Sequence, residues 1–349
     1  MQNLRQTLEH LLARRDLPEA QAALLLESLT FADTAPAMAS AILIALRAKG
    51  VTAAEVRGFA GAMRALARKP PLPIPVDAID IVGTGGDSSG SLNLSTGAAL
   101  LTAACGMRVV KHGNRSISSR CGSADLIEKL GLAMPLGETG VARCLQATGF
   151  TFLFAPYFHP AMKAIAPVRS ALGVRTVFNL LGPLTNPASP RYRLVGAYDA
   201  PSAKLMADTL AGMDIERAWV VHGAAGWDEA TPLGPFLAYE IAGGRVLERN
   251  VDPRDFGVAP CAAAELAGGD AAENAAALCA VFERRDRGAH LAALLLQSGL
   301  ALHIAGRADS IAGGIAQARA AVEEGRAAAW LAEFRRIAAE LSAAGSGAP

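Results

Sequence analysis

Residues 78–87, AIDIVGTGGD, determine the fold class of this chain. The run at 78–83 is short, apolar and rich in isoleucine and valine, which is typical of a buried strand. It ends in a glycine cluster, which lets the backbone turn sharply, and the stretch STGAALLTAACG at 95–106 then has a helical pattern. A strand, a glycine turn and a helix in this order are the repeating unit of an α/β fold.

The same alternation continues along the chain. Further apolar β-rich runs predict strands at 107–113, 150–156, 193–199 and 217–223, and helical patterns occupy 124–131 and 207–215. Strands that alternate with helices predict a mostly parallel central sheet covered by helices on both faces. The fold class is therefore α/β for this larger part of the chain.

The first 70 residues have a different sequence pattern: apolar residues recur at helical spacing, and no stretch alternates as a strand does. Asp33 or Thr34 is expected to cap one of these helices, and Thr52 with Glu55 has the spacing of a capping box. The proline-rich stretch KPPLPIPVD at 69–77 predicts a linker. We expect a small all-helical domain at 1–74, joined by a returning helical segment at about 168–188, and an α/β domain at 75–349. One apolar helix face is expected from Leu4, Leu8, Leu11 and Leu12.

Composition excludes several classes of protein. The 349 residues include 33 lysines and arginines against 32 acids, too even a balance for a chain whose main partner is nucleic acid. The five cysteines are scattered without a CxxC pair, which predicts buried thiols in a reducing cytosol. No signal-peptide pattern opens the chain, and its longest apolar run, at 291–306, is too short and interrupted for a bilayer. We expect a cytoplasmic protein with a buried helix there.

Glycines 83, 85 and 86 stand where a parallel strand ends, the edge at which open α/β sheets bind ligands. Bare N–H groups in such a turn suit an anion. Two familiar nucleotide loops are excluded: no lysine stands where a Walker A loop needs one, and Ser88 replaces the last glycine of the dinucleotide pattern. A plain tight turn is the alternative interpretation.

Asn93, Ser95 and Thr96 come next, at the start of the predicted helix. They offer amide, hydroxyl and N–H groups where the helix dipole favours negative charge. The Ser95 hydroxyl could also bind Mg²⁺, which prefers oxygen ligands. Simple helix capping would explain the same residues.

The stretch KHGNRSISSRCGS at 111–123 follows the second strand. Its first nine positions hold two cations, a histidine, an asparagine and three serines, and no acid. Hydrogen-bond donors concentrated at the end of a strand favour a diphosphate or phosphate ester as ligand. A solvated loop is the alternative.

Two further motifs complete the candidate site. Asp228 and Glu229 follow the strand predicted at 217–223; alone they would be exposed charges, but beside a diphosphate site they become candidate Mg²⁺ ligands. His159, Lys163 and Arg169 lie among apolar residues, and arginine can bind an aromatic carboxylate in bidentate fashion. A partly exposed helix arginine would explain Arg169 equally well.

Taken together these motifs resemble the anthranilate phosphoribosyltransferase family over nearly the whole chain. DIVGTGGD, NLST, KHGNRSISS with GSAD, HPAMK and VRTVFNLLGPLTNPA occur in the order of that family. The resemblance implies transfer of the phosphoribosyl group of phosphoribosyl pyrophosphate to the amine of anthranilate in tryptophan biosynthesis. It also implies Mg²⁺ and a homodimer built through the helical domain.

The resemblance implies a set of ligand contacts. Phosphoribosyl pyrophosphate would contact Gly83, Gly86, Asp87, Ser91, Asn93, Leu94, Ser95, Thr96, Lys111, His112, Gly113, Asn114, Arg115, Ser116, Ile117, Ser118, Ser119 and Ser123. Anthranilate would contact Gly83, Asn114 and Arg169, with His112 and His159 near its path. Mg²⁺ would be bound by Ser95, Asp228 and Glu229. No residue is a clear general base, and Lys111 and Arg169 are expected to act as electrostatic and positioning groups.

The chain departs from the family pattern in two places. The acidic loop of the family is usually HGxDGLDE, whereas Ala225 and Trp227 replace its first aspartate and its leucine here. Near the carboxyl end LLLQSGLAL stands for LLNAAAAL. Neither change removes the acidic pair. A pyrimidine nucleoside phosphorylase is the nearest rival and a non-catalytic nucleic-acid-binding relative a second, but the motif order and the retained carboxylates favour the transferase.

Overall fold

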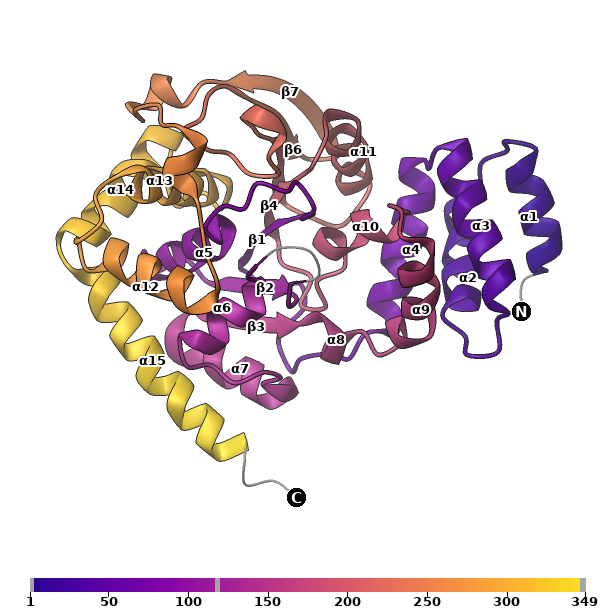
Figure 1. The fold of residues 1–349 in the computed structure, drawn as a ribbon, viewed down its shortest axis with the longest axis horizontal. Coiled ribbons are helices and arrows are strands. Elements are labelled where there is room, and N and C mark those ends of the chain that lie inside the picture. Colours follow the sequence, from indigo (N-terminus) through magenta and orange to yellow (C-terminus); the bar gives the residue numbers. More distant parts are fainter. Residues whose placement is uncertain (1–2, 117–119, 346–349) are drawn as a thin grey trace.

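The computed structural model describes residues 3–116 and 120–345. It confirms the predicted fold class, an all-helical domain beside a larger α/β domain (Figure 1). The helical domain comprises α1 (Leu4–Leu12), α2 (Glu19–Leu29), α3 (Pro36–Lys49) and α4 (Ala53–Leu66). Between α4 and the first strand, residues 67–78 contain neither helix nor strand, as the prolines predict.

The ends of these helices follow local chemistry only in part. The capping box is present: Glu55 N donates to Thr52 Oγ1 and Thr52 N donates to the Glu55 carboxylate. The cap expected at Asp33 or Thr34 is wrong, because α3 starts at Pro36 and the Thr34 hydroxyl instead donates to Ser28 O. The apolar face of α1 is also narrower than expected, since Leu12 in its last turn is 60% exposed.

Seven strands form one sheet in the order β3-β2-β1-β4-β5-β6-β7. Strands β1 to β5 are parallel, whereas β6 and β7 form an antiparallel extension that the sequence patterns did not predict. The strands are β1 (Ile79–Gly83), β2 (Val109–Gly113), β3 (Phe150–Phe154), β4 (Tyr192–Gly196), β5 (Arg217–His222), β6 (Phe236–Ala242) and β7 (Arg245–Val251). All five strands predicted from sequence are present.

The strand order reverses between β1 and β4. From β1 the chain proceeds outward through β2 and β3, then returns to β4 on the other side of β1 and proceeds to β5. Loops after β1 and β4 therefore leave in opposite directions, and the crevice between them is where open parallel sheets bind ligands.

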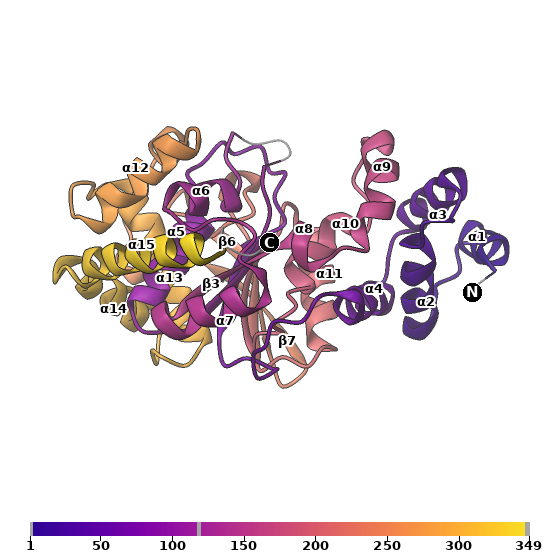
Figure 2. The same cartoon turned by 90° about the horizontal axis from the view of Figure 1, so that it is seen from below.

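One face of the sheet is covered by the carboxyl-terminal helices (Figure 2). Leu100, Leu294 and Leu300 are fully buried in this layer against Ile81. The run at 291–306 lies in the buried helix α13, as predicted. The layer contains α5 (Leu94–Ala104), α6 (Ser123–Lys129), α12 (Ala271–Phe282), α13 (Ala289–Ile304), α14 (Ile311–Glu323) and α15 (Arg326–Gly345), and α7 (Gly137–Thr148) packs on β3 and α15.

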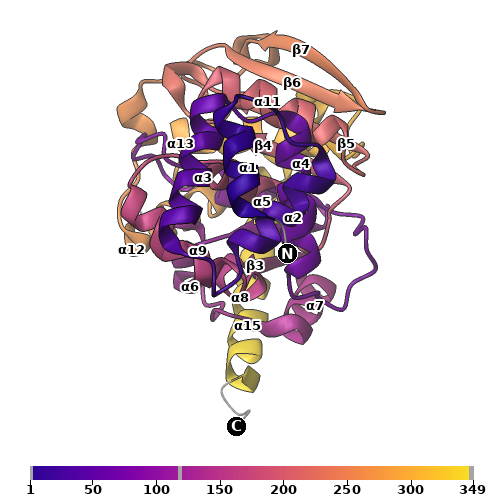
Figure 3. The ribbon, with the colours of Figure 1, turned by 90° about the vertical axis from the view of Figure 1, so that its right-hand side faces the viewer.

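The opposite face is covered by α11 (Ala200–Ala211), and the helical domain packs through α4 on α11 (Figure 3). Helix α11 begins earlier than the predicted 207–215, because the Asp199 side chain caps it by accepting from Ser202 N at 2.7 Å. The segment that returns to the helical domain contains α8 (Ala155–Phe158), α9 (Met162–Leu172), α10 (Phe178–Leu181) and the short 3-10 helix η1 (Gly182–Leu184). Short 3-10 helices also occur at Ala224–Gly226, Pro253–Phe256 and Ala263–Leu266.

The chain crosses between the two domains three times, the last time between η1 and β4, and the first two crossings are joined. The first is the linker after α4, and the second is the segment that starts at α8. Arg68 N on the first donates to Phe158 O on the second at 2.8 Å. Phe59 of α4 and Phe178 of α10 meet edge to face, with ring centroids 6.2 Å apart. The helical domain and the returning segment thus share one apolar core.

Candidate active site

Two glycines at the carboxyl ends of neighbouring strands make room for the acidic loop. Gly83 ends β1, Gly196 ends β4, and the two are paired in the sheet. A Cβ atom on Gly83 would lie 2.4 Å from Asp228 Oδ2, and one on Gly196 would lie 1.5 Å from Asp228 O. Because no side chain fits at either position, the strand ends themselves determine where Asp228 lies.

The glycine loop and the acidic loop hold each other. Gly85 and Gly86 have φ of +70° and +75°, in the left-handed region that favours glycine. Gly85 N donates to Asp228 Oδ2 at 2.5 Å and Thr84 Oγ1 donates to the same oxygen at 3.3 Å. In return Asp228 N donates to Asp87 Oδ2 at 3.3 Å. The expected convergence of the glycine turn with the paired acids is therefore present.

Glu229 connects the acidic loop to the start of α5. Ser95 N, in the first turn of that helix, donates to Glu229 Oε1 at 2.9 Å. Asn93 precedes this helix, and both ends of its side-chain amide are hydrogen-bonded. Its Nδ2 donates to Cys121 O at 3.0 Å, and its Oδ1 accepts from Asn274 Nδ2 at 2.9 Å. The predicted group at 93–96 thus meets the predicted acidic pair at one edge of the sheet.

Lys111 lies beneath these loops. Its side chain is buried, and Nζ donates to Ile81 O on the neighbouring strand. Burial lowers the pKa of Lys111 to about 8, and the negative charges of Asp80, Glu229 and Asp228 oppose that shift. The cation is therefore held inside the site, within reach of the acidic pair.

The carboxyl groups of the acidic loop repel one another. Burial, the largest cause, raises the pKa of Asp228, and the charge of Asp87 raises it further. Burial and the charge of Asp228 likewise raise the pKa of Glu229. Such groups gain from a cation that neutralises them.

Mg²⁺ fits this donor set when a ligand completes its coordination. Glu229 Oε2 is buried and accepts no hydrogen bond from the described residues. No three His, Cys, Asp or Glu side chains of the described ranges are arranged to hold a metal ion by themselves. Mg²⁺ characteristically takes one or two carboxylates together with phosphate oxygens of a substrate, which agrees with both observations.

The donor-rich loop is anchored by one carboxylate on α6. Asp125 accepts from Arg115 Nη1 at 3.0 Å, from Ser116 N at 3.1 Å and from Gly122 N at 2.9 Å, so it holds both ends of the loop. The Arg115 guanidinium also pairs with Glu128 at 2.5 Å. Arg115 thus points to α6 in this structure.

The remaining predicted positions of this region lie close by. Ser123 Oγ donates to Asn114 O at 3.2 Å, and Ser91 Oγ lies 3.2 Å from Ser89 Oγ, whose hydroxyl contacts Asp87. Gly113 ends β2, beside Ser123. The predicted contacts Ile117, Ser118 and Ser119 lie outside the described residues.

The residues predicted for the acceptor lie on the returning segment and at the end of β2. Arg169 on α9 is partly buried, with its guanidinium carbon 5.2 Å from the centre of the Phe178 ring. It forms no ion pair with the described residues, and burial lowers its pKa. An unpaired, partly desolvated guanidinium suits a carboxylate ligand.

His112 and His159 form a buried pair of rings 5.0 Å apart. His112 Nδ1 donates to Gly182 O at 3.0 Å, which leaves Nε2 as an acceptor. Within the described chain, neither that Nε2 nor either nitrogen of His159 has a hydrogen-bond partner. Burial lowers the pKa to about 4 for His112 and about 3 for His159, so both rings are neutral at pH 7.

A buried polar cluster supports this region from below, and the sequence patterns did not reveal it. Asp80 on β1 accepts from Asn186 Nδ2 at 2.9 Å and from His112 N at 3.3 Å. Asn186 Nδ2 also donates to Val110 O at 2.8 Å. Arg193 on β4 is fully buried and donates to Pro183 O at 3.1 Å. A lone aspartate inside the apolar run at 78–83 was the available signal, because a buried carboxylate requires partners.

Comparison with known proteins agrees with this architecture. Residues 75–328 match the model of the glycosyl transferase family, a/b domain, and residues 5–67 match that of its helical bundle domain. The chain is 43% identical to the anthranilate phosphoribosyltransferase of Rubrobacter xylanophilus over 98% of this chain and all of that one. It is 45% identical to that of Methylobacterium radiotolerans over 94% and 93% of the two chains.

Solved structures give the same result. The anthranilate phosphoribosyltransferase of Thermus thermophilus superposes with a TM-score of 0.89 at 38% identity and covers 95% of this chain and 99% of its own. The Saccharomyces cerevisiae enzyme in complex with PRPP and Mg has a TM-score of 0.85 at 27% identity, covering 97% and 98%. The chain therefore belongs to the anthranilate phosphoribosyltransferase family of glycosyl transferases.

Proposed function

We propose that the loops at the carboxyl edge of β1, β2 and β5 carry out the reaction of this family. The chain transfers the phosphoribosyl group of phosphoribosyl pyrophosphate to the amine of anthranilate, releasing pyrophosphate. The observation that carries the proposal is the hydrogen-bonded junction of Asp87, Gly85, Asp228 and, through Glu229, Ser95. It puts the carboxylates beside a glycine turn and a helix N-terminus, which suits a metal-bound diphosphate.

The donor would lie across the glycine loop and the start of α5. Backbone N–H groups at 83–87 and 93–96 would bind its phosphates, together with Lys111 Nζ and the loop anchored by Asp125. Ser95, Asp228 and Glu229 would hold Mg²⁺, which when bound would neutralise diphosphate charge. A related yeast structure is described as a complex with PRPP and Mg.

The acceptor would be oriented by Arg169, whose guanidinium would bind the anthranilate carboxylate. Gly83 and Asn114 would line the place of attack. The neutral rings of His112 and His159 would border the path of the acceptor without adding charge. Another yeast structure is described as a complex with 4-fluoroanthranilate, a close analogue of this acceptor.

Catalysis would consist mainly of alignment and stabilisation of the leaving group. The amine of anthranilate is uncharged –NH2 at neutral pH, so attack needs no strong base. The C1–O bond to pyrophosphate breaks as the C–N bond forms, and the proton that nitrogen then loses passes to water or to the released pyrophosphate. The difficult event is departure of pyrophosphate from the ribose carbon. Lys111 and the loop N–H groups would stabilise the charge that develops on pyrophosphate. Arg169 would hold the amine in line with the ribose carbon.

The direct test is anthranilate fluorescence, which should disappear on addition of phosphoribosyl pyrophosphate and Mg²⁺. Replacing Arg169→Ala should raise the anthranilate KM at least tenfold, with much less effect on the donor KM. An unchanged anthranilate KM would remove Arg169 from the acceptor site. Phosphorolysis of thymidine in place of transfer would instead identify a nucleoside phosphorylase.

The paired substitution Asp228→Asn with Glu229→Gln tests the metal site, because it keeps the size of both side chains and removes their charge. Turnover should fall by at least a hundredfold and should no longer depend on Mg²⁺ concentration. Metal-dependent turnover close to that of the unchanged chain would contradict these assignments.

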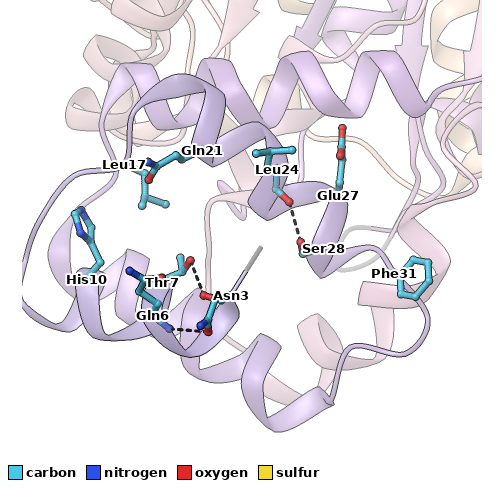
Figure 4. Close-up of a pocket in the computed structure, with 10 residues that line it drawn as sticks. All are labelled: Asn3, Gln6, Thr7, His10, Leu17, Gln21, Leu24, Glu27, Ser28 and Phe31. Carbon is cyan, nitrogen blue, oxygen red and sulfur yellow. Dashed lines mark hydrogen bonds between the residues drawn. The ribbon is translucent and has the colours of Figure 1, made fainter. Parts of the chain in front are cut away.

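We also propose a homodimer formed through the helical domain. Leu12, Leu24 and Phe31 are exposed by 60%, 52% and 51%, and Leu24 and Phe31 border a cavity of about 670 Å³ between α1 and α2 (Figure 4). Apolar groups of this size on one domain favour a second copy as the covering partner. Replacing Leu24→Glu and Phe31→Glu together should halve the mass measured by light scattering; an unchanged mass would place the interface elsewhere.

The division of the chain at residue 74, with 168–188 returning to the helical domain, remains a proposal, supported by the packing of α9 on α3. A cytoplasmic location is likewise proposed. No helix in the described residues is long and apolar enough to cross a membrane.

A further inference from the structure

Arg175 is a basic residue of the returning segment that belongs to the motif VRTVFNLLGPLTNPA but has no role among the ligand contacts described above. It lies between α9 and α10, and its side chain reaches the glycine loop on the other domain. Nη2 donates to Gly86 O at 2.5 Å, and the guanidinium carbon lies 3.8 Å from the centre of the Tyr198 ring. Two specific contacts therefore hold an arginine that is otherwise exposed.

Both contacts bear on the shape of the glycine loop. With Gly85 and Gly86 in the left-handed region, the loop can direct N–H groups toward an anion only if its carbonyl groups point away and find donors there. Arg175 supplies that donor at Gly86. Tyr198, on which Arg175 stacks, donates from its own N to Thr84 Oγ1 at 3.2 Å. Arg175 and Tyr198 thus hold the glycine loop at Gly86 and at Thr84.

The same residue is attached to the helical domain through its backbone. Arg47 Nη1 on α3 donates to Arg175 O at 2.9 Å. Arg169 stands six positions earlier on the same segment, at the end of α9. A short stretch of chain therefore carries the group proposed to hold the acceptor and the side chain that braces the donor loop.

We propose that Arg175 is a positioning residue that couples the donor loop to the acceptor segment. This inference rests on the proposed function of the site. If donor binding orders the glycine loop, the hydrogen bond from Arg175 to Gly86 O would be held in place. The segment that carries both Arg175 and Arg169 would then be held in position as well. Arg175 forms no ion pair with a carboxylate in the part of the chain described, so its charge also favours a diphosphate at the loop.

The test compares Arg175→Ala with Arg175→Lys and with a matched control, Arg254→Ala. Arg254 is also an exposed arginine, paired with Asp252 on a 3-10 helix after β7. Loss of a charged hydrogen bond and a stacked cation should raise the KM for phosphoribosyl pyrophosphate about tenfold, with kcat changed less than threefold. Lysine keeps one donor and the charge, so it should restore the KM to within about threefold. The control should match the unchanged chain.

A second readout measures the coupling itself. In the unchanged chain the anthranilate KM should be at least about threefold lower at saturating than at limiting phosphoribosyl pyrophosphate, and Arg175→Ala should bring this ratio close to one. If Arg175→Ala does not fold, Tyr198→Leu removes the stacking alone and should lower the same ratio. Donor KM and coupling ratio equal to those of Arg254→Ala would overturn the inference. Absence of transfer by the unchanged chain would instead refute the proposed function.

Discussion

Replacing Asp80→Ala should destabilise the protein by about 4 kcal/mol. The change removes an acceptor from Asn186 Nδ2 and from His112 N, which lie 2.9 and 3.3 Å from the carboxylate. The Asn186 amide keeps its bond to Val110 O, but one of its N–H groups and the N–H of His112 lose their acceptor, at a cost of about 1 kcal/mol each. The carboxylate also offsets the charges of Lys111 and Arg193, and loss of this compensation adds about 2 kcal/mol.

Asp77→Ala is the matched control, because Asp77 precedes the same strand but is half exposed and forms an ion pair with Arg307 at 3.7 Å. That change should cost less than about 0.5 kcal/mol. Thermal unfolding should give a Tm about 6 °C lower for Asp80→Ala, because an unfolding entropy of about 2.1 cal/mol/K per residue over 349 residues corresponds to roughly 1.4 °C per kcal/mol. Equal midpoints for the two variants would refute the reasoning, since the buried cluster would then contribute nothing measurable.

Two further predictions concern a glycine and a histidine. Gly196→Ala should reduce kcat by about a hundredfold, because the added Cβ would displace Asp228 O. The control is Gly61→Ala, whose Cβ would meet nothing within 4 Å and which should retain activity. Equal steady-state rates for the two variants would contradict the prediction. The folded pKa of His159, about 3, lies below its unfolded value, so the unfolded chain binds the extra proton and stability falls as pH drops below about 6.5. Between pH 7 and 5, urea unfolding should show a loss about 2 kcal/mol smaller for His159→Gln than for the unchanged chain, and parallel pH curves would contradict a buried neutral ring.

The parallel strands and the helical domain could be predicted because their signals are local. Alternating apolar runs, proline-rich linkers and the spacing of Thr52 and Glu55 reflect the chain's own short-range chemistry. The β6–β7 hairpin was missed although Gly243 and Gly244, with φ of +55° and +73°, form a turn between the strands. Two adjacent glycines between apolar runs are a recognised hairpin signal, and the sequence contains it at this position.

The candidate site was predictable only as a set of separate loops. The glycine turn and the acids could be expected to meet, because parallel strands end at one edge of a sheet. Arg175 could not be identified in this way, since it contacts a loop 89 positions away in the sequence. Leu12 could not be placed from sequence either, because helical spacing groups it with the buried Leu11, whereas in the folded chain Leu12 is 60% exposed.

Two of the three crossings between the domains are joined at Arg68 and Phe158, and this junction restricts how the molecule can open. A domain attached by one chain segment can rotate in any direction. Two adjacent segments that are bonded to each other favour rotation about an axis that passes through both. Because Arg169 follows directly on the second crossing, such a rotation would sweep it toward or away from the sheet edge along a single arc. The distance between anthranilate and the bound donor would then depend on the angle of rotation about this axis.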